Sequence, residues 1–156
     1  MRIKCRKNAV FTAPKSKFAF YFLSLTWGAP KTITGALAAL ALRLTGHRTV
    51  KYGPAWCFEL PGIDWGLELG LFFIAPEGGD ERIKAHELGH GIQNIYFGIF
   101  TPLVVSLPSA IRFRYRRIRK RKGRPCKSGY DEIWFERSAT ESGMEYMRTR
   151  IGKKEQ

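Results

Sequence analysis

His86-Glu87-Leu88-Gly89-His90 predicts a helix at the centre of this chain, because its two imidazoles can act together only on an α-helix. Residues four apart on a helix lie one turn above each other, so both rings can reach one ion. Zinc accepts neutral imidazole, and a catalytic zinc keeps a coordination position open for water. Glu87 follows the first histidine, where its carboxylate could take a proton from that water. The string therefore predicts a metal site; a solvated helix face or a hydrogen-bonded core histidine pair is the alternative.

A helix over residues 81–97 is expected around this string. Pro76-Glu77-Gly78-Gly79 interrupts the preceding segment, and Asp80 is a favourable N-cap residue. Both histidines then belong to one inward-facing stripe, and inward-facing polar groups need partners, of which a metal ion is the natural one. The stripe consists of Ile83, His86, Glu87, His90, Asn94 and Phe97.

The middle of the chain is expected to form strands. Residues 50–59 carry scattered aromatic side chains and Pro54, and the Pro61-Gly62 turn follows them. Residues 65–71 alternate between apolar and other side chains and continue into the apolar residues 72–74. These patterns predict a short antiparallel sheet, and together with the helices they indicate an α+β domain.

A C-terminal helix is expected to supply the third metal ligand. The segment from Ser128 to Asp131 resembles a capping box, and cationic residues gather at the other end of this helix. Glu136 falls on the small, apolar face, where a lone carboxylate is costly unless it is paired or binds a metal. Glu132, one turn earlier, is the rival ligand, and a salt bridge from Glu136 to an arginine is the alternative role.

Length and composition place all 156 residues in one domain with enough apolar residues, 44%, for a core. The net charge of +14 favours phosphate-rich partners, either nucleic acid or an anionic membrane surface. Cys5, Cys57 and Cys126 are far apart and odd in number, so they indicate neither a disulfide framework nor a cysteine zinc site.

Two regions have the composition of membrane-associated segments. Within residues 1–45, basic residues precede apolar runs at 18–27 and 33–42, each too short to cross a bilayer. These runs are expected to form either helices at a membrane surface or ordinary buried core helices. Residues 95–124 combine an apolar stretch with a polybasic segment, in which nine of the thirteen residues from Arg112 to Arg124 are Lys or Arg. If His86, His90 and Glu136 hold one ion, both ends of the apolar stretch 95–111 lie on the same side of any membrane. That stretch is then expected to re-enter, to lie flat or to join the core, with Pro102 and Pro108 as bending points.

His86-Glu87-Leu88-Gly89-His90, with Glu136-Arg137-Ser138-Ala139 further along, resembles the gluzincin pattern of zinc metallopeptidases. The chain is also similar to small membrane-associated metallopeptidases in its apolar segment with Pro108-Ser109. The resemblance implies a zincin-like fold in which His86, His90 and Glu136 bind Zn²⁺ and Glu87 is the general base.

The chain departs from the gluzincin pattern at two places. Thr140 stands where gluzincins often place an aspartate that orients a histidine. No sequence feature marks the histidine or tyrosine that would stabilise the oxyanion, and Tyr130 and Tyr146 are the candidates for that role. The metzincin pattern is excluded, because Gln93 and Tyr96 occupy the positions of its glycine and third histidine.

The function expected from these patterns is hydrolysis of a peptide or protein substrate by a zinc-activated water. The expected location is an anionic membrane surface, with the active site on the cytoplasmic side because cationic flanks tend to stay there. The alternative is a basic nucleic-acid- or membrane-binding module whose metal is structural or absent. Nucleic acid is the weaker expectation, since no zinc-finger spacing, RNA-binding signature or helix-turn-helix pattern is visible.

Overall fold

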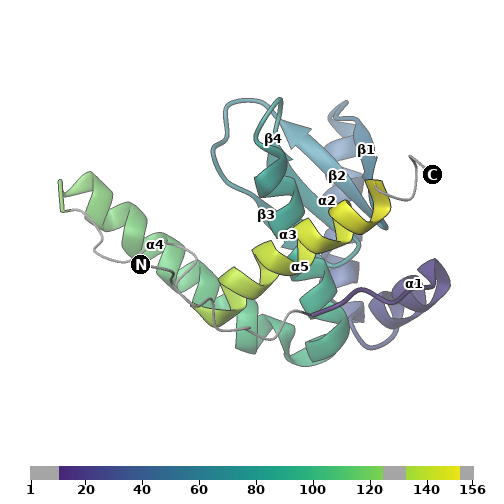
Figure 1. The fold of residues 1–156 in the computed structure, drawn as a ribbon. Coiled ribbons are helices and arrows are strands. Elements are labelled where there is room, and N and C mark those ends of the chain that lie inside the picture. The colour runs from purple at the N-terminus through teal and green to yellow at the C-terminus, as the bar shows by residue number, and fades with distance from the viewer. Residues whose placement is uncertain (1–10, 125–132, 152–156) are drawn as a thin grey trace.

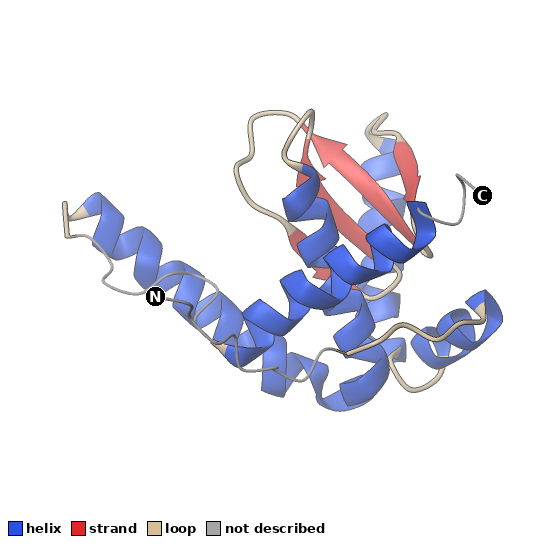
Figure 2. Cartoon of the chain, in the orientation of Figure 1, coloured by secondary structure: helices blue, strands red, loops and turns tan. Residues whose placement is uncertain are grey.

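A computed structural model describes residues 11–124 and 133–151. It confirms the α+β class, because helices surround one small sheet (Figures 1 and 2). The helix α5 (Trp134–Ile151) lies across α3 (Glu81–Phe97), and α4 (Leu107–Arg121) extends away from the rest of the molecule. The segment from His86 to His90 lies on α3, next to the sheet.

The two apolar runs near the N-terminus form separate helices, α1 (Lys17–Leu25) and α2 (Ala29–Leu44). Ser16 caps α1 by accepting a hydrogen bond from the amide of Ala19 at 3.5 Å. Pro30 lies in the first turn of α2, where its missing N–H costs nothing. The break at residues 28–30 therefore ends one helix and begins the next.

The sheet contains β1 (Thr49–Tyr52), β2 (Ala55–Leu60), β3 (Leu67–Leu69) and β4 (Phe72–Pro76), in the order β1-β2-β4-β3. β1 and β2 form one antiparallel hairpin, and β3 and β4 form another. Gly53 and Gly70 make these turns possible, with φ of +59° and +73°.

The expectation of an antiparallel sheet was wrong in one respect, because β2 and β4 pair in parallel and the sheet is mixed. Each expected strand is also two strands, since a turn divides it. The parallel pairing joins two hairpins that are each determined locally, and no local sequence pattern specifies which strand of one meets which strand of the other.

The helix α3 (Glu81–Phe97) has the bounds expected from the sequence. The carboxylate of Asp80 caps it by accepting a hydrogen bond from the amide of Arg82 at 2.9 Å. The buried side chains of Leu88 and Ile92 pack into two apolar clusters, one on the sheet and one reaching α1 through Phe20. Burial of these side chains fixes the rotation of α3 and turns its polar stripe toward α5.

The helix α5 (Trp134–Ile151) packs on α3 at very short range through two glycines. A Cβ added at Gly89 on α3 would lie 1.8 Å from the carbonyl oxygen of Ala139 on α5. A Cβ added at Gly143 on α5 would lie 1.7 Å from the carbonyl oxygen of Ala85 on α3. Only glycine allows this approach, which brings polar side chains on the two helices within reach of each other.

The apolar stretch after α3 bends sharply at Pro102, one of its two expected bending points, whereas Pro108 lies in the first turn of the following helix and causes no second bend. It forms η1 (Gly98–Phe100) and the π-helical turn η2 (Pro102–Ser106), and continues as α4 (Leu107–Arg121). The segments Glu81–Phe100 and Pro102–Arg121 meet at 117°. Most of the polybasic stretch is therefore a helix that begins near the bend.

Candidate metal centre

Three side chains from two helices converge at the contact between α3 and α5. The Nε2 atoms of His86 and His90 lie 3.1 Å apart. Oε2 of Glu136 lies 3.1 Å from Nε2 of His86 and 3.4 Å from Nε2 of His90. Glu136 is fully buried and His90 nearly so, whereas the side chain of His86 is 14% exposed. Among the residues that the structure describes, these three form the group with metal-ligand geometry.

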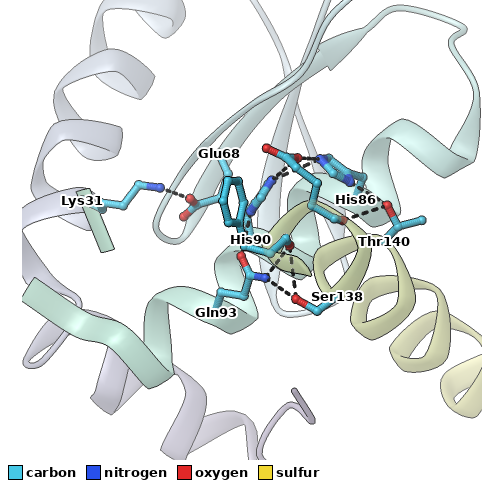
Figure 3. A network of polar contacts seen from close by, with 9 residues as sticks. Lys31, Glu68, His86, His90, Gln93, Ser138 and Thr140 are labelled. Carbon is cyan, nitrogen blue, oxygen red and sulfur yellow. Dashed lines mark hydrogen bonds and ion pairs between the residues drawn. The ribbon is translucent and has the colours of Figure 1, made fainter. Parts of the chain in front are cut away.

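Hydrogen bonds determine which nitrogen of His90 faces this centre. Gln93 is fully buried, and its amide nitrogen donates to the carbonyl oxygen of Phe135 at 2.7 Å and to Oγ of Ser138 at 2.8 Å (Figure 3). Its Oε1 must therefore be the atom 2.9 Å from Nδ1 of His90, and it accepts the Nδ1 proton. The lone pair of Nε2 is left pointing toward the other two groups.

Thr140 fixes His86 in the same way from α5. Its hydroxyl lies 3.3 Å from the carbonyl oxygen of Glu136, to which it donates. Its oxygen can then accept the Nδ1 proton of His86, at 2.8 Å (Figure 3). Thr140 thus orients His86 with a neutral hydroxyl.

Three hydrogen-bond acceptors consequently meet with no donor between them. Both carboxylate oxygens of Glu136 are buried, and while both Nε2 atoms carry no proton, neither imidazole donates a hydrogen bond to them. Such an arrangement of lone pairs repels itself unless a cation or a proton lies between them. Burial acts to raise the pKa of Glu136, but the two adjacent imidazoles outweigh it and hold that pKa below its usual range.

When no metal is bound, a proton can lie between these three acceptors. Burial acts to lower the pKa of His90, but its hydrogen bond to Glu136 and the charge of Glu87 raise the pKa above the usual value. A metal ion can replace that proton, since metal ligands bind in their deprotonated forms.

The spacing of the three atoms fits zinc. Bonds of 2.0–2.1 Å in a tetrahedron require ligand atoms about 3.3 Å apart. The three separations in this structure are 3.1, 3.1 and 3.4 Å. Two neutral imidazoles and one carboxylate are also the ligand set of many catalytic zinc sites, which keep the fourth position open.

Glu87 lies beside the centre, facing a cavity of about 710 Å³ that is also lined by His86 and Thr140. Gly66, just before β3, leaves room for its carboxylate: a Cβ there would lie 2.4 Å from Oε1 of Glu87. Burial raises the pKa of Glu87, and the charges of His86 and His90 oppose that rise. A raised pKa suits a group that takes up and returns a proton near neutral pH.

The structure therefore brings together all four expected site residues: His86, Glu87, His90 and Glu136. Glu132, the rival metal ligand, and Tyr130, a candidate for oxyanion stabilisation, lie outside the described residues. Tyr146 packs against both apolar clusters and does not line the cavity.

Sequence reasoning did not identify the orienting roles of Gln93 and Thr140. For Gln93 a signal was present, because it lies three residues after His90 and hence on the same side of α3. Its role also needs Ser138 and the backbone of α5, which only the packing of two distant helices brings to it.

No protein-family model, no curated protein and no solved structure matches this chain.

Proposed function

We propose that this protein is a zinc-dependent hydrolase that cleaves peptide bonds. The observation that carries the proposal is the convergence of three acceptor atoms, from His86, His90 and Glu136, at separations that suit zinc. A structural zinc would be enclosed by four protein ligands, whereas this centre offers three among the described residues and borders a cavity.

Each residue has a defined task in this proposal. A bound zinc supplies Lewis acidity and lowers the pKa of a coordinated water. Gln93 and Thr140 hold the two imidazoles with Nε2 toward the centre. Glu87 accepts the proton of the attacking water and delivers it to the leaving amine. The cavity gives the substrate access to Glu87 and His86 from the same side.

A peptide is the favoured substrate because of the motif resemblance to gluzincins, in which the same ligand types carry out peptide hydrolysis. The test uses zinc-loaded protein incubated with a mixture of peptides made by digesting a proteome. Mass spectrometry should detect new peptide ends with the wild type and none with Glu87→Gln, which should retain its zinc. The matched control is Glu145→Gln on the exposed surface of α5, which should cleave like the wild type. Equal cleavage by Glu87→Gln and wild type would remove Glu87 as the base.

We further propose that the protein binds a membrane surface, with its active site on the cytoplasmic side. The support is an unusual number of exposed apolar side chains on α1, on α2 and at the bend after α3. Trp27, at the turn from α1 to α2, contacts Phe100 at the bend, with ring centroids 6.1 Å apart. The most exposed are Phe18, Leu25, Ile33, Leu37, Leu44 and Leu103.

The bend offers a way to insert without crossing the bilayer. In the part of the chain that the structure describes, no single helix has the length and apolar character needed to span a membrane. The bent pair Glu81–Phe100 and Pro102–Arg121 meets those criteria only when its two helices are combined. Flotation with vesicles of neutral and anionic phospholipids at high salt tests the insertion.

Leu103→Asp at the bend should reduce flotation, because a charge would have to enter the lipid. Val50→Asp, at an exposed apolar position on β1, is the control and should float like the wild type. Wild-type protein that stays at the bottom of the gradient even at low salt would end the membrane proposal and leave the zinc site unaffected.

A further inference from the structure

The cavity beside Glu87 has a strongly cationic wall, and most of that wall comes from one face of α4. Five cationic and two acidic side chains line the cavity. One of the two acids is Glu87 itself, which leaves Asp64 as the other negative group. The cationic residues are Arg82, Arg116, Arg117, Lys120 and Arg121.

The spacing on α4 shows that the helix presents these cations as a stripe. Phe113, Arg117 and Lys120 recur at intervals of three or four residues, so they share one side of the helix and face the cavity. Ile111, Tyr115 and Ile118 fall on the opposite side and are exposed. The side of α4 that faces the cavity is thus largely cationic, and three exposed apolar side chains lie on the opposite side.

The cationic stripe lies where a bound substrate would extend from the scissile bond, since His86 and Glu87 line the same cavity. A cavity of about 710 Å³ is within the size range of ligand-binding pockets. Grouped cations on a concave surface concentrate the field and attract negative groups. Among negative groups, the carboxylates of a peptide fit a pocket adjoining a peptidase centre.

We propose that this cationic face of α4 selects peptide substrates with acidic residues next to the cleaved bond. The inference rests on the proposed peptidase function and names its substrate class. A lipid headgroup is less favoured, because the apolar face of α4, which suits contact with a bilayer, is the one turned away from the cavity. A nucleic-acid duplex is less favoured because it needs an extended basic surface, and these cations gather around one cavity beside the candidate metal centre.

The experiment measures binding, so that it does not depend on cleavage. Zinc-loaded Glu87→Gln protein is titrated into a fluorescein-labelled decapeptide with three glutamates around a central apolar pair. The comparison peptide has glutamines in place of the glutamates. Fluorescence anisotropy gives both dissociation constants, and metal analysis of the same samples reports the zinc content separately. Binding is measured both with and without zinc. A protein that holds no zinc therefore refutes the proposed function, and the two dissociation constants measured without metal still test the acidic preference.

Two triple variants with equal net charge separate the cavity wall from bulk charge. The first, Arg117→Gln/Lys120→Gln/Arg121→Gln, neutralises residues that line the cavity. The second neutralises exposed cations of the same region that do not line it, Arg114, Lys122 and Arg124.

The acidic peptide should bind more tightly than its glutamine counterpart, and the first variant should weaken that binding about tenfold. The second variant should bind like the Glu87→Gln parent. Equal weakening by both triples would mean that only net charge matters and would overturn the proposal. The proposal would also be overturned if neither peptide binds and if phosphatidylglycerol vesicles or a DNA oligonucleotide bind the parent protein but not the first variant.

Discussion

Replacing Gly89 by alanine should force apart the two helices that carry the metal ligands. The new Cβ would lie 1.8 Å from the carbonyl oxygen of Ala139. A carbon and a carbonyl oxygen need about 3.3 Å, so one helix must move by about 1.5 Å. The obstacle is backbone, which cannot rotate away as a flexible side chain can.

This displacement should disrupt zinc binding more than it disrupts folding. His86 and His90 lie on α3, and Glu136 on α5 is 3.1 and 3.4 Å from them. A shift of about 1.5 Å along those directions would leave them near 5 Å, beyond the roughly 3.3 Å that a tetrahedral zinc allows. Losing one of three ligands should weaken zinc binding by at least about 100-fold.

The cost in stability should be smaller. Overpacking costs about 1–3 kcal/mol. Alanine is favoured over glycine within a helix by about 1 kcal/mol, which offsets part of that cost. The assays are competition with a chromophoric zinc chelator and thermal unfolding of the metal-free protein followed by circular dichroism.

Gly91→Ala is the matched control on the same helix. Its Cβ would meet only the carbonyl oxygen of Gly70, at 3.3 Å, and that contact requires little movement. It gains the same helix propensity, so its zinc affinity should stay within about twofold of the wild type. The reasoning is refuted if Gly89→Ala binds zinc as tightly as Gly91→Ala does, because the close approach of α3 and α5 would then not hold the ligands.

Three further outcomes follow from the site and the core. Thr140→Val should lower zinc affinity about tenfold, because His86 loses the hydroxyl that orients it. Thr149→Val removes another hydroxyl on α5 that bonds a backbone carbonyl, and it should leave the zinc affinity unchanged in the same competition assay. The pKa of His90 is raised, so zinc must displace a proton when it binds. Calorimetry in buffers of different ionisation enthalpy should show proton release and a zinc affinity that increases from about pH 6 to pH 8. A zinc affinity independent of pH would contradict this prediction. Burial, followed by the charge of Glu59, raises the pKa of Cys57 from 9.0 to about 12, so the unfolded thiol ionises first and this group lowers stability as pH rises between those values. In a variant without the other two cysteines, a thiol reagent should accordingly modify Cys57 only as fast as the protein unfolds, and rapid modification of the folded protein would show that the thiol is accessible.

The sequence predicted the parts of the fold whose determinants are local. The bounds of α3 follow from Asp80, whose carboxylate caps the first turn, and from Gly98, which ends the helix with φ of +54°. The inward position of Glu136 followed from the small residues that share its face, and the structure shows it fully buried. The bend followed from proline chemistry at Pro102.

Features that depend on contacts between distant segments were not predictable in the same way. No local sequence pattern links the residues that meet in the parallel pairing of β2 with β4 or in the hydrogen bond from Gln93 to the backbone of α5. The cationic wall was visible in the sequence only as a basic run. Which side of α4 faces the cavity depends on the bend at Pro102, and the sequence alone does not give the angle of that bend.

Metal content is the most direct test of the central claim, that His86, His90 and Glu136 form a zinc centre. Purified wild-type protein, loaded with zinc and dialysed, should contain one zinc per chain by inductively coupled plasma mass spectrometry. His86→Ala and Glu136→Ala should contain little or none while their circular dichroism shows a folded protein. Folded wild-type protein that binds no zinc, or the same zinc content in all three proteins, would contradict the claim.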